Sequence, residues 1–149
     1  MNIKIFIMIS ILLTSTGSNS MMKSNFDGDN QDEILVTSPW GIGILKPNAD
    51  TFTSPLIHPN GTRFDEWLLN TDDNQFNLIG DFNGDDQNEI LVTSPWGIGI
   101  LKHKGDTFSN PYIHPNGTRF GGWLLNTADN QFNLIGDFDG DGRDEILVT

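Results

Sequence analysis

The segment Asp137–Thr149 reads DFDGDGRDEILVT, an acidic stretch that turns abruptly into an apolar run. Its first nine residues hold five carboxylates and two glycines. Carboxylates this close together repel one another, and the repulsion grows where the local dielectric constant is low. Nearly the same segment occurs twice earlier, as NFDGDNQDEILVT at 25–37 and DFNGDDQNEILVT at 81–93. The chain therefore repeats one unit, an acidic loop followed at once by a strand-like run.

The acidic loops belong to a longer internal repeat. A shift of 56 residues places 25–80 on 81–136 with 43 identical positions, and a third copy begins at Asp137. Repeats of this length are typical of solenoids and propellers. The sequence therefore predicts two full repeats, 25–80 and 81–136, and a truncated third at 137–149.

Within each repeat, short β-rich runs such as EILVTS and GIGILK alternate with turns rich in Gly, Pro, Asn and Asp. This pattern predicts an all-β fold of about two four-stranded β-propeller blades plus a partial third. EILV and NLIG are apolar on both faces, as stacked blades require. The glycines of GIGILK are expected to let another segment approach the strand closely. A β-sandwich is the alternative fold, but near-identical repeats favour radial or linear stacking.

Two blades and a partial third do not close a propeller, which usually takes four to eight blades. The uncovered faces and strand edges would invite association. Either the chain is a fragment of a longer array, or several copies assemble into one ring. In the second case the EILVT run of the truncated repeat is expected to complete the sheet of a neighbouring copy.

Composition and the N-terminus limit the class of protein. Eight basic residues against twenty acidic ones give a net charge of −12, which argues against a nucleic-acid partner. The absence of cysteine excludes disulfides and thiolate metal sites. Residues 1–20 combine Lys4, the apolar run Ile5–Leu13 and a small polar end. They predict a signal peptide and a secreted, extracellular protein, because the apolar run is too short to span a membrane.

The acidic loops are candidate calcium sites. When each loop is numbered from its first residue, positions 1, 3, 5 and 9 carry side-chain oxygens in all three copies. Alternate side chains of a curled loop converge on one point, and Ca²⁺ requires such oxygen donors. Position 7 is expected to offer its backbone carbonyl, so its side chain is free to vary. The predicted ligands are Asn25, Asp27, Asp29, Gln31, Glu33, Asp81, Asn83, Asp85, Gln87, Glu89, Asp137, Asp139, Asp141, Arg143 and Glu145.

Two further positions support a tightly bent loop. Position 4 is always Gly, and position 6 is Asn, Asp or Gly, the residue types that best tolerate a positive φ angle. An EF-hand does not fit, because the last acid is at position 9 and a strand follows. The open alternative is an acidic turn that stays solvated and binds no ion. Side-chain oxygens occur at positions 1, 3, 5 and 9 of all three loops, and this favours a calcium site over a solvated turn.

The segment DFDGDGRDEILV resembles the calcium loop of FG-GAP/VCBS repeats, the blades of integrin α-subunit propellers. The surrounding GDTF, NGTRFGGW and FNLIGDFDGDG are similar to fungal seven-bladed propeller lectins and related bacterial repeat proteins. The resemblance covers 25–149. It implies a calcium-binding propeller, with N-acetylglucosamine or sialic acid bound in pockets between adjacent blades. Glu at position 9 and Asn25 at position 1 depart from the commonest calcium pattern.

The segments NGTRF and WLLNT, present in both repeats, hold candidate sugar-binding residues. Exposed Trp faces stack on sugars, while Arg and Asn bind hydroxyl groups. The alternative is that these tryptophans pack between blades as core residues. The candidate ligand-binding residues are Arg63, Trp67, Asn70, Arg119, Trp123 and Asn126.

These residues leave two functions open. One is a carbohydrate-binding, lectin-like module with glycan partners. The other is an integrin-like adhesion module that binds a cell-surface or extracellular protein and in which calcium is structural. An enzyme is not expected, because the sequence contains no paired nucleophile and base.

Overall fold

The computed structural model describes residues 21–149, so the predicted signal peptide at 1–20 lies outside the described residues. The prediction of an all-β fold is confirmed, since residues 21–149 form fourteen strands and contain no helix. Within these residues no helix is therefore available to span a membrane.

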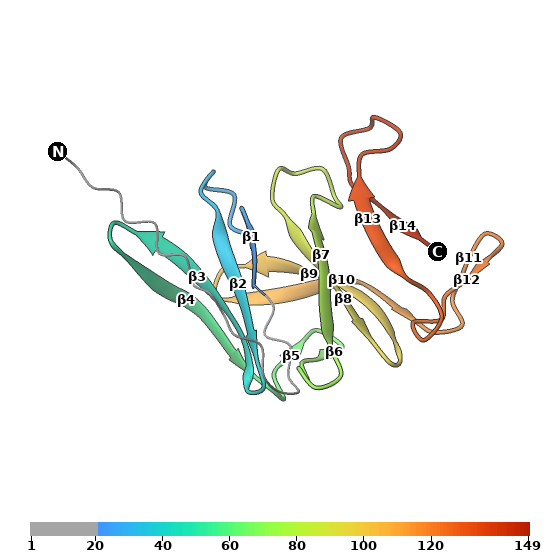
Figure 1. Cartoon of the computed structure of the whole chain (residues 1–149), viewed down its shortest axis with the longest axis horizontal. Coiled ribbons are helices and arrows are strands. Elements are labelled where there is room, and N and C mark those ends of the chain that lie inside the picture. Colours follow the sequence, from blue (N-terminus) through green and yellow to red (C-terminus); the bar gives the residue numbers. More distant parts are fainter. Residues whose placement is uncertain (1–20) are drawn as a thin grey trace.

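The strands form two complete four-stranded antiparallel sheets and part of a third (Figure 1). Blade 1 consists of β1 (Met21–Ser24), β2 (Glu33–Ser38), β3 (Gly41–Asn48) and β4 (Thr51–Pro59). Blade 2 consists of β7 (Gln75–Gly80), β8 (Glu89–Ser94), β9 (Gly97–Lys104) and β10 (Thr107–Pro115). Blade 3 has two strands, β13 (Phe132–Gly136) and β14 (Glu145–Val148).

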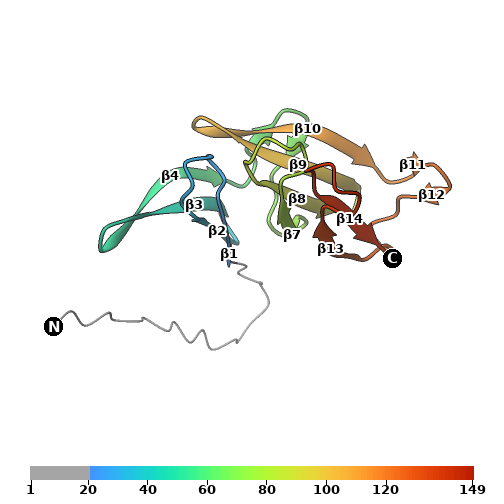
Figure 2. The same ribbon diagram turned by 90° about the horizontal axis from the view of Figure 1, so that it is seen from above.

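Two short hairpins connect the blades. They are β5 (Arg63–Phe64) with β6 (Trp67–Leu68), and β11 (Arg119–Phe120) with β12 (Trp123–Leu124). Seen from above, blade 2 lies between blade 1 on one side and blade 3 with β11–β12 on the other (Figure 2).

The sheets are offset from the limits of the sequence repeats. β7 belongs to the repeat 25–80 by sequence, yet it pairs with β8 of the next repeat. The same offset places β13 beside β14. Each acidic loop therefore connects the first and second strands of one blade, and all three loops lie at the same edge of the molecule, at the top of Figure 1.

The run EILVTS shows how the blades cover one another. In β2 its residues alternate between buried and half-buried, whereas in β8 all six are buried. Blade 1 covers one face of β8, and blade 3 lies over the other. The expectation that EILV is apolar on both faces because blades stack is confirmed in blade 2.

The main core lies between blades 1 and 2. It joins Leu35, Ile44 and Leu56 of blade 1 to Ile90 and Leu101 of blade 2, all at most 2% exposed. The hairpin β5–β6 seals this core at the edge opposite the acidic loops (Figure 1).

Trp67 of this hairpin is the largest fully buried side chain. Its indole Nε1 donates a hydrogen bond to Asn74 Oδ1 over 3.1 Å, and its ring lies 4.4 Å from that of Trp96. The ring also packs over Gly99 of β9, where an added Cβ would lie only 2.8 Å from the indole. The expected close approach at the strand glycines is confirmed here.

Gly99→Ala is expected to destabilise the protein by roughly 1–3 kcal/mol, because the new methyl group would lie 2.8 Å from the Trp67 ring and 2.5 Å from Asn110 Nδ2. The control is Gly43→Ala at the same position of blade 1, where the nearest atom is the Leu56 carbonyl oxygen at 3.3 Å. Urea denaturation of both variants in dilute protein measures the difference. Equal losses of stability would contradict this account of the blade interface.

Candidate metal centre

Each acidic loop gathers carboxylate oxygens around one point. The oxygens of Asp27, Asp29 and Glu33 lie within 4.8 Å of one another, and the same holds in the other two loops. The members there are Asp81, Asp85 and Glu89, and Asp137, Asp139, Asp141 and Glu145. The structure therefore brings together most of the predicted side-chain donors.

The side chain at position 1 organises the loop. Asp137 Oδ1 accepts hydrogen bonds from the amides of Gly140 and Asp141, at 2.7 and 3.0 Å, and its Oδ2 accepts one from Gly142 at 3.0 Å. Asp81 makes the equivalent three bonds in the second loop. Asn25 has one oxygen and accepts from Gly28 alone among the bonds described for its side chain. The first loop is therefore held by fewer bonds at this position.

The backbone bends where the sequence predicts it. At position 4, Gly28, Gly84 and Gly140 have φ angles of 80°, 78° and 81°. At position 6, Asn30 and Asp86 have φ angles of 65° and 64°. The expectation of positive φ at both positions is confirmed, and the bends turn the alternate side chains inward.

The glutamate at position 9 closes the base of each loop. Its Oε2 accepts the backbone N–H of the phenylalanine at position 2, at 2.8, 3.0 and 2.8 Å in the three loops. Glu33 and Glu89 are only 1% exposed. Glu33 Oε1 is buried and has no hydrogen-bond partner. Each glutamate thus places its carboxyl group beside the other acidic side chains of the loop. This carboxyl group is buried in the first two loops and partly exposed in the third.

Two lysines that the sequence analysis did not select enter these loops. Lys46 Nζ lies 2.5 Å from Asp27 Oδ2, 2.6 Å from Asp29 Oδ2 and 3.6 Å from Glu33 Oε1. Lys102 pairs with Asp85 and lies 3.1 Å from Glu89 Oε1. Both end the run GIGILK, on the strand beside the one that carries the glutamate, and this pairing is the signal that could have identified them.

The ion pairs shift the pKa values of their members. Hydrogen bonds to the lysine ammonium groups lower the pKa values of Asp29 and Asp85. Burial raises the pKa of Glu89, and Lys102 opposes that rise. Hydrogen bonds to Asp27 and Asp29 raise the pKa of Lys46, which therefore stays cationic. In the first two loops a protein ammonium group thus supplies part of the positive charge that the carboxylates require.

Neighbouring loops also touch one another. Asn88 N–H donates to the Asn25 carbonyl at 3.0 Å, and Asp144 N–H donates to the Asp81 carbonyl at 2.8 Å. An added Cβ at Gly28 would lie 2.9 Å from the Gln87 side chain. An added Cβ at Gly84 would lie 3.2 Å from the Arg143 side chain. The side chains at position 7 thus contact the preceding blade, and the role of their carbonyls as calcium ligands stays a prediction.

The candidate sugar-binding residues of each repeat lie in or just after a short hairpin, and they differ in exposure. Trp67 is buried and has no free ring face, whereas Trp123 is 43% exposed. Asn70 and Asn126 each bond the aspartate three residues later, so their amides close local turns. Arg63 and Arg119 are exposed at the ends of their short strands.

The comparisons with known proteins identify the repeat. Residues 81–148 match the family model described as FG-GAP-like repeat. No curated protein and no solved structure matches the chain. Residues 25–80 share 43 of 56 positions with 81–136, which lies within the matched segment. Residues 81–148 therefore resemble an FG-GAP-like repeat, and residues 25–80 share most of that sequence.

Proposed function

We propose that this protein is a secreted, calcium-stabilised β-propeller repeat protein that acts as an extracellular binding module rather than as an enzyme. One observation carries the proposal: three loops at one edge each bring carboxylate oxygens within 4.8 Å of one another. Oxygen donors in this arrangement suit Ca²⁺. The leader pattern of residues 1–20 supports secretion.

The donor sets fit a divalent cation unequally. The third loop has four carboxylates, and no ion pair among residues 21–149 involves it. The first two loops have three carboxylates each and a lysine among them. Calcium in these two loops would replace the ammonium group beside the glutamate. The third loop is therefore the strongest candidate site, held by Asp137, Asp139, Asp141 and Glu145.

Calcium is expected to raise the melting temperature relative to chelator, because ligand at 100 times its Kd stabilises the folded state by about 2.7 kcal/mol per site. Asp139→Asn and Asp141→Asn should reduce this rise. The control Asp106→Asn lies in the β9–β10 turn, outside the loops, and should keep it. Differential scanning calorimetry in calcium and in chelator measures the effect. Identical melts in both conditions would refute the calcium proposal.

Lys102→Met tests the competition between lysine and calcium. In chelator the variant is expected to unfold at a lower temperature, because buried Glu89 loses its cationic partner. In calcium the difference from the unmodified chain should shrink, since the ion supplies the missing charge. Lys104→Met, an exposed lysine at the end of the same strand, is the matched control. A loss of stability that calcium leaves unchanged would show that the lysine and the ion do not share a site.

The binding partner is an extracellular protein or a glycan. The burial of Trp67 and the local hydrogen bonds of Asn70 and Asn126 favour a protein partner, with calcium holding the loops in one conformation. Trp123 is the candidate that favours a glycan, because 43% of it is exposed. The similarity to fungal lectins stays a prediction.

A glycan array probed with the labelled chain separates the two partners. Glycan binding that Trp123→Ala abolishes would support a lectin, with Trp40→Ala as a control for an exposed tryptophan outside the candidate site. Absence of binding to any glycan would favour the protein partner.

A further inference from the structure

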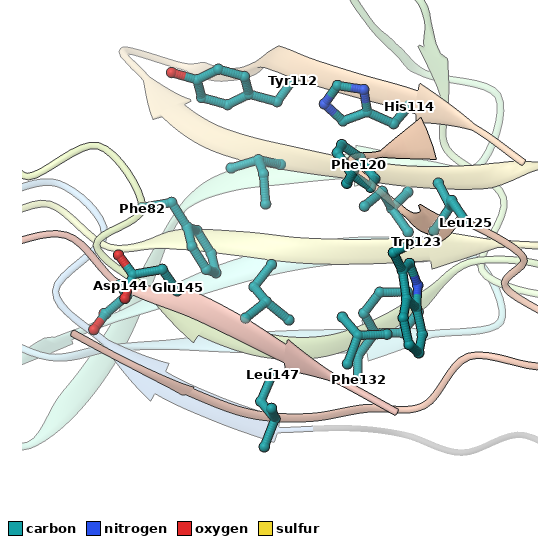
Figure 3. Close-up of a pocket in the computed structure, with 14 residues that line it drawn as sticks. Phe82, Tyr112, His114, Phe120, Trp123, Leu125, Phe132, Asp144, Glu145 and Leu147 are labelled. Carbon is teal, nitrogen blue, oxygen red and sulfur yellow. The ribbon is translucent and has the colours of Figure 1, made fainter. Parts of the chain in front are cut away.

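The residue at position 8 of the second and third acidic loops contacts the loop of the preceding blade. This residue is Asn88 in the second loop and Asp144 in the third. Asp144 lies beside Glu145 at one end of the pocket that β9 and β14 line, near Phe82 of the second loop (Figure 3). Neither residue at position 8 is among the predicted calcium ligands, so the role of this position is open.

Asp144 holds the backbone of Asp81, which is position 1 of the second loop, through two hydrogen bonds. Its N–H donates to the Asp81 carbonyl over 2.8 Å, and its Oδ2 accepts the Asp81 N–H over 2.8 Å. The Asp81 carboxylate in turn accepts three backbone N–H groups of its own loop. A residue of the third loop therefore fixes the residue that organises the second loop.

The first and second loops are joined by a different side chain at position 8. Asn88 N–H donates to the Asn25 carbonyl over 3.0 Å, as Asp144 N–H does to Asp81. The Asn88 side-chain amide donates to Ser24 Oγ, which belongs to the residue before position 1. The backbone contact is thus the same in both pairs of loops, and the side-chain contact differs.

The residue before position 1 is complementary to its partner in each pair of loops. Ser24 has a hydroxyl group that accepts the Asn88 amide. Gly80 stands in the equivalent place ahead of the second loop, and an added Cβ there would lie 2.7 Å from Asp144 Oδ2. The lack of a side chain at Gly80 therefore leaves room for the Asp144 carboxylate to reach the N–H of position 1.

One buried oxygen, besides the clustered carboxylates, points to a cation in these loops. Glu33 Oε1 is buried, accepts no hydrogen bond and lies 3.6 Å from Lys46 Nζ. A buried carboxylate oxygen without a hydrogen bond is costly, and a bound divalent ion would remove that cost. Glu89 is equally buried at the same position of the second loop. The donor sets therefore fit a cation whose affinity depends on how well the loop is held.

We propose that Asp144 is a positioning residue for a cation in the second loop. It fixes Asp81 from the neighbouring blade, and it thereby raises the cation affinity of a loop to which it does not belong. This inference rests on the proposed function, because it requires that the loops bind calcium. The third loop thus contributes to the second site without supplying a ligand to it.

The test measures the calcium affinity of each loop separately. The amides of Gly28, Gly84 and Gly140 each lie at position 4 of one loop, so their NMR signals distinguish the three loops. The full chain and its Asp144→Ala variant are labelled with ¹⁵N and titrated with calcium. The Kd measured at Gly84 is expected to rise roughly 2- to 10-fold in the variant, the size of one net hydrogen bond. The Kd at Gly28 should not change.

Two variants separate the hydrogen bond from the charge. Asp144→Asn keeps a side-chain oxygen that can accept the Asp81 N–H, so its Kd at Gly84 should stay close to that of the unmodified chain. Asp106→Ala removes one negative charge from the β9–β10 turn, outside the loops, and should also leave this Kd unchanged. In chelator the Asp81 amide is expected to exchange with deuterium faster in Asp144→Ala than in Asp144→Asn, because its acceptor is missing.

The possible failures can be told apart. If the unmodified chain binds calcium but the Kd at Gly84 is the same in Asp144→Ala, the positioning role is wrong and the calcium proposal stands. A rise in Kd confined to Gly140, or an equal rise in Asp106→Ala, would overturn the positioning role in the same way. If no loop of the unmodified chain responds to calcium, the proposed function itself is refuted and the positioning role falls with it.

Discussion

The packing of one blade on the next is the interaction on which the structure depends. Each central strand is apolar on both faces, so a sheet is stable only where another element covers each face. Trp67 meets this requirement between blades 1 and 2, because Gly99 leaves room for the indole ring. The equivalent Trp123 has no such cover among residues 21–149 and stays partly exposed.

The acidic edge follows from the same packing. Stacking of the blades brings their acidic loops side by side. Backbone hydrogen bonds from Asn88 to Asn25 and from Asp144 to Asp81 join neighbouring loops. This stacking concentrates negative charge along one edge. Lys46 and Lys102 offset part of it in two loops. A divalent cation would offset the remaining negative charge of the loops. The loops would then share one conformation.

Much of the fold and of the candidate site could be predicted from sequence, because both rest on local rules. Glycine and asparagine at positions 4 and 6 predicted the bends, since few other residues tolerate a positive φ angle. The carboxylates at alternate positions predicted the cluster. Lys46 and Lys102 were missed because they lie 17 residues beyond Asp29 and Asp85, and only strand pairing brings them into the loops. For Trp67 the sequence left open a sugar-binding residue and a core residue between blades, because burial cannot be seen in a local motif; the structure shows the core residue.

The run EILVT separates what the sequence by itself determined from what the tertiary structure decided. All three copies form strands after an acidic loop, because β-branched and apolar residues favour that conformation and the bent loop positions the strand. Burial differs among the copies: alternate residues are buried in β2, all are buried in β8, and none of residues 145–149 is fully buried. The sequence is the same in each copy, so the number of covering blades decides the difference.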